Sequence, residues 1–232
     1  MAQTIALAGK GGVGKTTICG MLIEYLCEKK NGPVLAVDAD ANSNLNEVLG
    51  VEVEDTLGDI REDLTRAEMA SETVMTKADY AEMRFSDALT EADDYDLLVM
   101  GRTQGKGCYC FVNGLLTTQV AKYAKNYRYI VVDNEAGLEH LSRGVLPQVD
   151  TILLVSDCSR RGVQAAGRLS EMIVELKLGA KEVGLIINRA PGGTVSPGVQ
   201  AEIDKYGMKL IGVVPHDDTV YEYDAEGRPS VT

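Results

Sequence analysis

Seven apolar runs of strand length recur along the chain of 232 residues, and they limit its possible folds more than any other feature. Within each run the apolar residues are continuous rather than alternating, which is typical of strands buried on both faces of a parallel sheet. Parallel strands need crossover connections, and stretches of helix length lie between most of the runs. The runs are TIALA (4–8), VLAVD (34–38), DLLVM (96–100), YIVVD (129–133), TILLVS (151–156), EVGLIIN (182–188) and KLIGVVP (209–215). We therefore predict an α/β fold with a doubly wound, mostly parallel sheet of about seven strands and helices on both faces.

A glycine-rich loop directly follows the first of these runs. GKGGVGKTT matches the phosphate-loop pattern G-x-x-x-x-G-K-[ST] through Gly9, Gly14, Lys15 and Thr16. Such a loop curls its backbone N–H groups around phosphate oxygens, and the next helix directs the positive end of its dipole at the anion. We expect Lys15 to reach the β- and γ-phosphates and Thr16 to hold Mg²⁺. The residues predicted to bind the nucleotide here are Gly9, Lys10, Gly11, Gly12, Val13, Gly14, Lys15, Thr16 and Thr17.

Three aspartates stand where predicted strands end, at the edge where sheets of this kind bind ligands. VDADANSN supplies Asp38 and Asp40, and YIVVDNEAGLEH supplies Asp133 at the Walker B position. Carboxylates can hold Mg²⁺ and orient the attacking water, and phosphoryl transfer needs little other protein chemistry. An aspartate at a strand end can also merely cap the next turn. We predict Mg²⁺-dependent hydrolysis of ATP to ADP and phosphate, with Thr16 and Asp133 on the metal side.

The nucleotide base is expected to lie near the end of the sixth predicted strand. A guanine reader of the N-K-x-D type would place a carboxylate there, but the chain reads NRAP. ATP is therefore favoured over GTP. We expect Asn188, Arg189 and Pro215 to line the base pocket, although an asparagine at a strand end also commonly caps a turn.

Charge is spread unevenly along the chain. The formal net charge is −12, and residues 51–94 contain fourteen Asp and Glu against four Lys and Arg, which leaves −2 for the rest. We predict a single P-loop ATPase domain over residues 1–232, with an acidic helical insertion at about 51–94 that is most simply a solvated face. The chain has no cluster of Lys and Arg for a phosphate backbone, and no apolar run approaches the roughly 18 residues of a membrane span. Nucleic acid and membrane partners are therefore not expected.

The cysteines divide into two groups. Their odd number, five, is typical of a reducing compartment, so we expect a cytoplasmic protein. Cys19, Cys27 and Cys158 lie in or beside apolar segments and are expected to pack in or near the core. Cys108 and Cys110 differ, because GKGCYCFVNG is a polar, glycine-rich loop. Two thiols are too few for a tetrahedral metal site, so a loop disulfide or idle thiols stay open as alternatives.

The early lysine of the phosphate loop extends its pattern to KGGxGKT. Through Lys10 the loop resembles the deviant Walker A class of nucleotide hydrolases, which includes nitrogenase iron protein, MinD, ParA and the arsenite pump ATPase. The resemblance implies a homodimer that sandwiches two nucleotides, with Lys10 of each subunit reaching the nucleotide of the other. It also implies that Asp40 activates water, that Asp38 serves the metal and that Asn188 contacts adenine. A solvated loop cation is the alternative for Lys10.

Several segments together are similar to a narrower group, the CooC-type ATPases. They are GKGGVGKTT, VDADANSNL, GRTQGKGCYCFVNGLL, VVDNEAGLEHLSR and NRA. These ATPases are accessory proteins for nickel insertion into carbon monoxide dehydrogenase, and a close relative serves acetyl-CoA synthase. The resemblance implies that Cys108 and Cys110 of two subunits form a four-thiolate site for Ni²⁺, or for Zn²⁺, and that the ion is delivered to the apo-enzyme. Ala41 departs from the proline that the wider class often has.

Other functions of the wider class fit less well. An iron–sulfur cluster of the nitrogenase type needs a cysteine after Asp133, and DNEAGLEHLSR has none. DNA partitioning requires a basic surface, and a membrane role of the MinD type requires a basic amphipathic helix near the C-terminus. EGRPSVT (226–232) reads instead like a helix start that is barely continued, which suggests a truncated form. A zinc-dependent dimerisation switch or scaffold without metal delivery is the alternative function.

Overall fold

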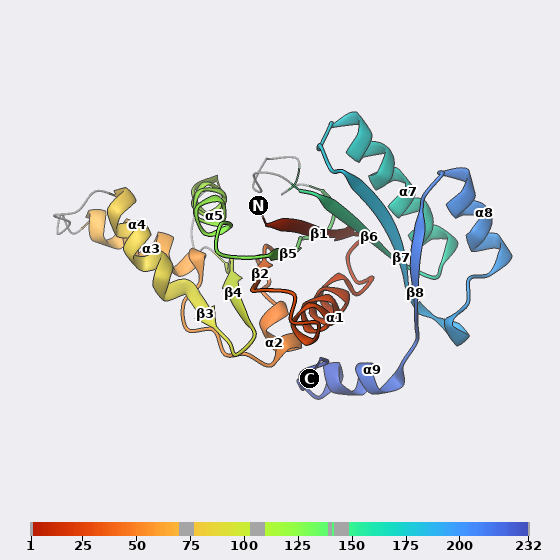
Figure 1. The fold of residues 1–232 in the computed structure, drawn as a ribbon, viewed down its shortest axis with the longest axis horizontal. Helices are drawn as coiled ribbons and strands as arrows, with labels where there is room; N and C mark the ends of the chain where they lie inside the picture. Colours follow the sequence, from red (N-terminus) through yellow and green to blue (C-terminus); the bar gives the residue numbers. More distant parts are fainter. Residues whose placement is uncertain (1, 70–76, 103–109, 139–140, 142–148, 232) are drawn as a thin grey trace.

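The computed structural model describes residues 2–69, 77–102, 110–138, 141 and 149–231, which form an eight-stranded sheet. The strand order is β3-β4-β2-β5-β1-β6-β7-β8, and all neighbouring strands are parallel except β3 and β4 (Figure 1). The strands are β1 (Gln3–Gly9), β2 (Val34–Asp38), β3 (Leu89–Glu91), β4 (Tyr95–Val99), β5 (Tyr129–Asp133), β6 (Thr151–Asp157), β7 (Glu182–Ala190) and β8 (Leu210–Pro215). The predicted α/β class is confirmed, and each of the seven apolar runs forms one parallel strand.

The additional strand is β3, which the apolar pattern does not predict. It has three residues and pairs antiparallel with β4, with Leu89 opposite Leu98 and Glu91 opposite Asp96. All three β3 residues are at least partly exposed to solvent. Because so short an edge strand buries little, it carries no apolar run of its own, and only its pairing with β4 defines it.

Helices cover both faces of the sheet, as predicted. They are α1 (Lys15–Glu28), α2 (Leu45–Leu49), α3 (Leu57–Met69), α4 (Lys77–Ala88), α5 (Cys110–Tyr123), α7 (Arg160–Glu175), α8 (Pro197–Lys205) and α9 (Asp218–Ala225), with a 3₁₀ turn at Pro191–Gly193. α1, α2 and α9 lie on one face, and α5, α7 and α8 lie on the other (Figure 1). Within the described part of the chain, no helix is long and apolar enough to cross a membrane.

The central strand β1 shows why the apolar runs are continuous. Its side chains alternate between the two faces, and both faces are buried. Ile5 and Leu7 belong to the core under α1, whereas Ala6 and Ala8 belong to the core under α5 and α7. A strand in this position has no solvated side, so the polar residues of an ordinary amphipathic strand are missing.

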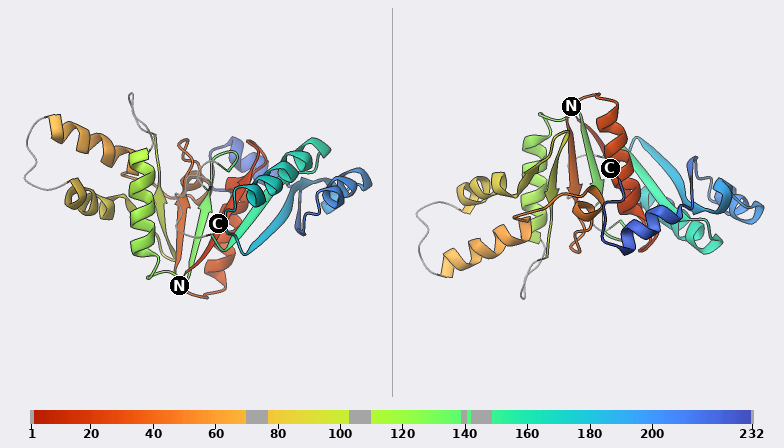
Figure 2. Two further views of the ribbon diagram at one scale, coloured as in Figure 1. Left: turned by 90° about the horizontal axis from the view of Figure 1, so that it is seen from above. Right: turned by 90° about the horizontal axis from the view of Figure 1, so that it is seen from below.

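The acidic segment at 51–94 contains α3, α4 and β3, which extend beyond the β4 edge of the sheet (Figure 2). The ring of Phe85 on α4 is fully buried and stacks on Tyr123 of α5, with 5.1 Å between the centroids. Arg84 lies between two carboxylates, 3.3 Å from Asp55 and 3.0 Å from Asp63. This arginine offsets part of the repulsion in the segment. That the segment is an insertion into a single domain stays a prediction.

The expectation that EGRPSVT begins a helix is wrong. α9 ends at Ala225, and the chain then turns, with the N–H of Arg228 donating to the carbonyl of Tyr223 at 2.8 Å. From there it runs along α2, where the N–H of Ser230 donates to the carbonyl of Val48 at 3.1 Å. Pro229 packs so closely against Gly50 that a Cβ added to Gly50 would lie 2.6 Å from the Cγ of Pro229. Proline and packing against α2 thus replace the expected helix.

Candidate nucleotide-binding site

The predicted phosphate loop connects β1 to α1 at the carboxyl edge of the sheet. Gly12 and Gly14 have φ angles of 78° and 88°, a left-handed conformation that favours glycine. Gly14 is also the N-cap of α1, and a Cβ on it would clash with the Asn188 side-chain nitrogen. A Cβ on Gly9 would likewise clash with the carbonyl of Val155 on β6. The glycine pattern therefore follows from backbone conformation and from the closeness of β6 and β7.

The two lysines of the loop differ in environment. Lys15 is only 8% exposed, and its Nζ lies 3.5 Å from the carbonyl oxygen of Lys10, so its ammonium group is held inside the loop. The side chain of Lys10 is exposed. This difference suits the predicted roles, in which Lys15 binds phosphates in its own subunit and Lys10 extends away from the loop.

Asp133 is the most constrained charged group of the site. Its side chain is 2% exposed and accepts a hydrogen bond from Thr16. Its Oδ1 is buried without a hydrogen-bond partner among the described residues. Burial raises the pKa of Asp133 to about 7, an effect that the Thr16 hydroxyl opposes and the nearby Asp38 reinforces. A buried carboxylate oxygen without a partner, next to a threonine hydroxyl, fits a hard cation such as Mg²⁺.

Asp38 holds the turn that follows β2. It is fully buried, and its two oxygens accept hydrogen bonds from the N–H groups of Asp40 and Leu45, each at 3.0 Å. Burial raises the pKa of Asp38 to about 6, although these backbone donors lower it in part. Asp38 thus fixes both ends of residues 40–45. Its predicted role on the metal side stays a prediction.

Asp40 is half-buried and faces the nucleotide cleft. Its Oδ1 accepts two hydrogen bonds from Asn42, one from the backbone N–H at 2.8 Å and one from the side-chain amide at 3.1 Å. No described residue donates a hydrogen bond to its Oδ2. The carboxylate is therefore oriented through one oxygen, and the other is available to a water molecule.

The segment after β5 is joined to the phosphate loop. The N–H of Gly137 donates to the carbonyl of Gly9 at 3.1 Å, and the side-chain amide of Asn134 donates to the carbonyl of Leu7 at 2.8 Å. These bonds place residues 134–137 beside the phosphate loop.

The end of β7 is also tied to the loop. The Asn188 amide donates to the carbonyl of Val13 at 2.9 Å, and its oxygen accepts from the N–H of Arg189 at 2.9 Å. The Arg189 guanidinium donates to the carbonyl of Gly12 at 3.4 Å. Pro215, at the end of β8, is not among the residues that line the cleft. The adenine contacts predicted for this group stay predictions.

These elements enclose a cleft of about 550 Å³, large enough for a nucleotide. Its wall includes Asn42 and Asn44 of the VDADANSN segment, for which no role was predicted. Other residues of the wall lie outside the motifs: Glu47, Val48, Asp224, Gly227, Arg228 and Ser230. The last four come from the end of α9 and from the chain after it, which packs against α2, and no short pattern predicts such a contact.

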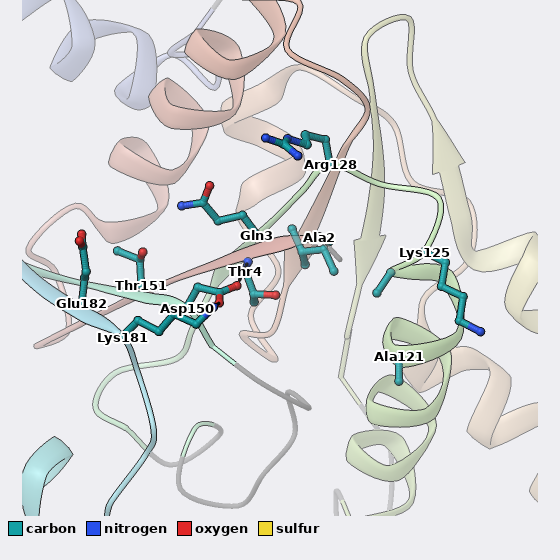
Figure 3. Close-up of a pocket in the computed structure, with 12 residues that line it drawn as sticks. Ala2, Gln3, Thr4, Ala121, Lys125, Arg128, Asp150, Thr151, Lys181 and Glu182 are labelled. Atoms are coloured by element: carbon teal, nitrogen blue, oxygen red, sulfur yellow. Dashed lines mark hydrogen bonds and ion pairs between the residues drawn. The ribbon is translucent and has the colours of Figure 1, made fainter.

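A larger hollow of about 780 Å³ lies at the opposite, amino-terminal edge of the sheet (Figure 3). On one side of it, Asp150 accepts a hydrogen bond from the N–H of Thr4 at 2.9 Å and pairs with Lys181 at 2.6 Å. Lys125, just after α5, lies on the other side. None of the residues of the predicted phosphate site lines this hollow, so it is separate from the nucleotide cleft.

The predicted thiolate site falls outside the described residues. Cys108 lies in the part of the chain that is not described, and for Cys110 the structure gives only its backbone place as the first residue of α5. Cys19 is buried, Cys27 and Cys158 are partly buried, and all three are free. Within the described ranges, no group of three or more His, Cys, Asp or Glu side chains is placed to hold a metal ion.

Comparisons with known proteins agree with this geometry. The CobQ/CobB/MinD/ParA nucleotide binding domain matches residues 4–231. An ATP-binding protein of Methanocaldococcus jannaschii is 44% identical over 231 residues, which cover 97% of this chain and 89% of that protein. The carbon monoxide dehydrogenase accessory protein CooC of Rhodospirillum rubrum is 31% identical over 237 residues, covering 96% and 87%. The septum site-determining protein MinD of Pyrococcus horikoshii, solved with Mg-ADP, superposes with a TM-score of 0.70 at 25% identity, covering 99% and 88%.

Proposed function

Because the chain belongs to the CobQ/CobB/MinD/ParA family of nucleotide-binding domains, we propose that it binds Mg²⁺ and ATP and hydrolyses ATP to ADP and phosphate. The observation that carries this proposal is the pair of Thr16 and Asp133. Thr16 lies in the first turn of α1, directly after the phosphate loop, and its hydroxyl donates to the Asp133 carboxylate, whose Oδ1 is buried without a described partner. Such a pair is what a magnesium ion bound to nucleotide phosphates requires.

The reaction follows from where the charges lie. Mg²⁺ would neutralise charge on the phosphates when bound. Lys15, at the base of the loop, stabilises the negative charge that develops on the transferred phosphoryl group. Asp40, oriented by Asn42, holds the attacking water through its second oxygen. Lys10 of a second copy completes the site from outside, so the active form is a homodimer.

We further propose that this ATPase carries nickel. Two copies of the chain bring together Cys108 and Cys110 from each, and four thiolates form a complete site for Ni²⁺, or for Zn²⁺. The client is an apo carbon monoxide dehydrogenase or acetyl-CoA synthase, which receives the ion for its active-site cluster. Two features support this step: the GCYC sequence, and the similarity to CooC over 96% of the chain. The thiols of Cys19, Cys27 and Cys158 are free, which supports a location in the reducing cytoplasm.

Nucleotide and metal are coupled in this proposal. Both favour the closed dimer, so each ligand raises the affinity of the other, and hydrolysis loosens the dimer and releases the ion. The first experiment measures bound nickel and oligomeric state with and without ATP. We expect about one ion per two chains, bound more tightly with ATP. Cys108→Ser/Cys110→Ser should lose the ion and the nickel-dependent dimer, whereas Cys27→Ser, a partly buried thiol elsewhere, should keep both. Retention of nickel by the double variant would refute the site.

A second experiment separates metal delivery from a scaffold role. Nickel activation of apo carbon monoxide dehydrogenase or apo acetyl-CoA synthase is followed with the parent protein and with Lys15→Ala. The parent with ATP should accelerate activation, and the variant should not, because it lacks the cation that holds the β- and γ-phosphates. Equal activation by both proteins, or a dimer that keeps zinc and never speeds activation, would contradict delivery. Phosphate release measured alongside tests hydrolysis itself, and normal turnover by Lys15→Ala would contradict that assignment.

A further inference from the structure

A chain of side-chain hydrogen bonds leads away from Asp40 to Arg102, a residue for which the sequence motifs predict no role. Asn42 donates to Asp40 through its amide nitrogen at 3.1 Å, and its amide oxygen accepts a hydrogen bond from the Arg102 guanidinium. The amide of Asn42 therefore has both ends occupied, which fixes its orientation. Asn42 lines the nucleotide cleft, whereas Arg102 does not. Any influence of Arg102 on the nucleotide must act through Asn42.

The backbone of Arg102 is held firmly in place. It follows β4 through Gly101, which has a φ of 67° and packs against Thr56 so closely that a Cβ would clash. A Cβ on Gly58, at the start of α3, would clash with the carbonyl oxygen of Arg102, and the N–H of Gly58 donates to the carbonyl of Met100 at 2.9 Å. The backbone of residues 100–102 thus packs against the start of α3. An arginine with its backbone fixed in this way can hold Asn42 in one position.

Arg102 joins the ends of two neighbouring strands. It follows β4, and its side chain contacts the turn after β2 that carries Asp40. Because β2 and β4 are parallel neighbours, both ends lie at the same edge of the sheet. The link between Asn42 and Arg102 joins parts of the chain that are 60 residues apart.

We propose that Arg102 is a positioning residue that orients Asp40 through Asn42 for ATP turnover. This inference rests on the ATP hydrolysis proposed above. With the link intact, Asp40 presents its free oxygen to the attacking water. Without Arg102, the amide of Asn42 loses its fixed orientation, and the water loses its alignment. Because a misplacement of about 1 Å can cost roughly 100-fold in rate, the loss of this one hydrogen bond is enough to slow turnover.

The test measures steady-state ATP turnover of the full chain with Mg²⁺. Arg102→Ala should lower kcat at least about tenfold while the KM for ATP changes by less than about twofold, since the nucleotide contacts remain. Asn42→Ala should behave alike, and the double variant should be no worse than either single variant, because both remove one link. Arg102→Lys, which can still donate one hydrogen bond, should recover part of kcat. Arg66→Ala, which removes an exposed arginine from α3, is the matched control.

The outcomes are distinguishable. Unchanged kcat in Arg102→Ala, multiplicative losses in the double variant, or a tenfold rise in KM alone would overturn the positioning role; the last would mean direct nucleotide binding. If the parent hydrolyses ATP and Arg102→Ala keeps its kcat, the positioning role is wrong while the proposed function stands. If the parent shows no ATP turnover, the proposed hydrolysis and the positioning role both fail.

Discussion

Replacing Gly14 by alanine tests how rigidly the phosphate loop is packed against β7. Two costs arise. The φ of 88° is unfavourable for any residue with a Cβ, at about 1–2 kcal/mol. The new methyl group also clashes with the Asn188 side chain, which must give up its 2.9 Å hydrogen bond to Val13 in a buried place, at about 1–3 kcal/mol. Gly14→Ala should therefore lower the free energy of unfolding by about 2–5 kcal/mol.

Two further glycines separate these costs. Gly12 has a φ of 78° but nothing near its hypothetical Cβ, so Gly12→Ala should cost only the backbone strain of about 1–2 kcal/mol. Gly114 on α5 is exposed, has no positive φ and has open space, so Gly114→Ala should stabilise by about 0.5–1 kcal/mol. The assay is urea unfolding of nucleotide-free protein with the denaturant slope compared between variants. Equal losses for Gly12→Ala and Gly14→Ala would refute the idea that Asn188 holds the loop rigidly.

The remaining predictions concern charge. The pKa of Asp133 is raised to about 7 in the folded chain. Between about pH 4 and pH 7 the folded state therefore keeps a proton that the unfolded carboxylate has lost. The contribution of this proton to the free energy of unfolding declines as the pH rises from about 4 to about 7. In metal-free protein, Asp133→Asn should flatten the pH dependence of the unfolding free energy over this range; an unchanged dependence in urea titrations at several pH values would contradict the assignment. Arg84→Ala should cost about 1 kcal/mol or more, because Asp63 and its acidic neighbours lose a shared partner, whereas Arg66→Ala, 75% exposed, should cost less than about 0.5 kcal/mol. Equal losses in urea unfolding would show that the Arg84 network adds nothing.

Much of the fold can be predicted from local sequence pattern. The seven parallel strands are buried on both faces of the sheet, and their continuous apolar runs indicate this burial. The phosphate loop can also be predicted from the sequence, since positive φ angles at Gly12 and Gly14, and a close approach of Asn188 at Gly14, require glycine itself. Strand β3 is not readable, because its three residues are defined only by pairing with β4. The same holds for the link between Asn42 and Arg102, which depends on where β2 and β4 place their ends in the folded sheet.

The course of the chain after α9 shows a different limit. EGRPSVT contains an acidic residue, a glycine and a proline in an order that suits a helix start, but its conformation is decided by its neighbours. Val48 offers a carbonyl that accepts from Ser230, and Gly50 leaves room for the ring of Pro229. Local propensity is a weak guide where tertiary contacts of this kind compete with it.

The cleft is built from both halves of the chain, and this has a consequence for synthesis on the ribosome. Residues 9–17 emerge early, but the strands that flank β1 begin only at Tyr129 and Thr151, and the cleft wall at Asp224 and Ser230 follows later still. At about 5–20 residues per second, the phosphate loop waits roughly 6–24 s for its first neighbouring strand. During that interval a nascent chain exposes the loop without the sheet that shapes it. We therefore expect nucleotide to bind only after these later segments have joined the sheet, so that the first folding steps proceed without ATP.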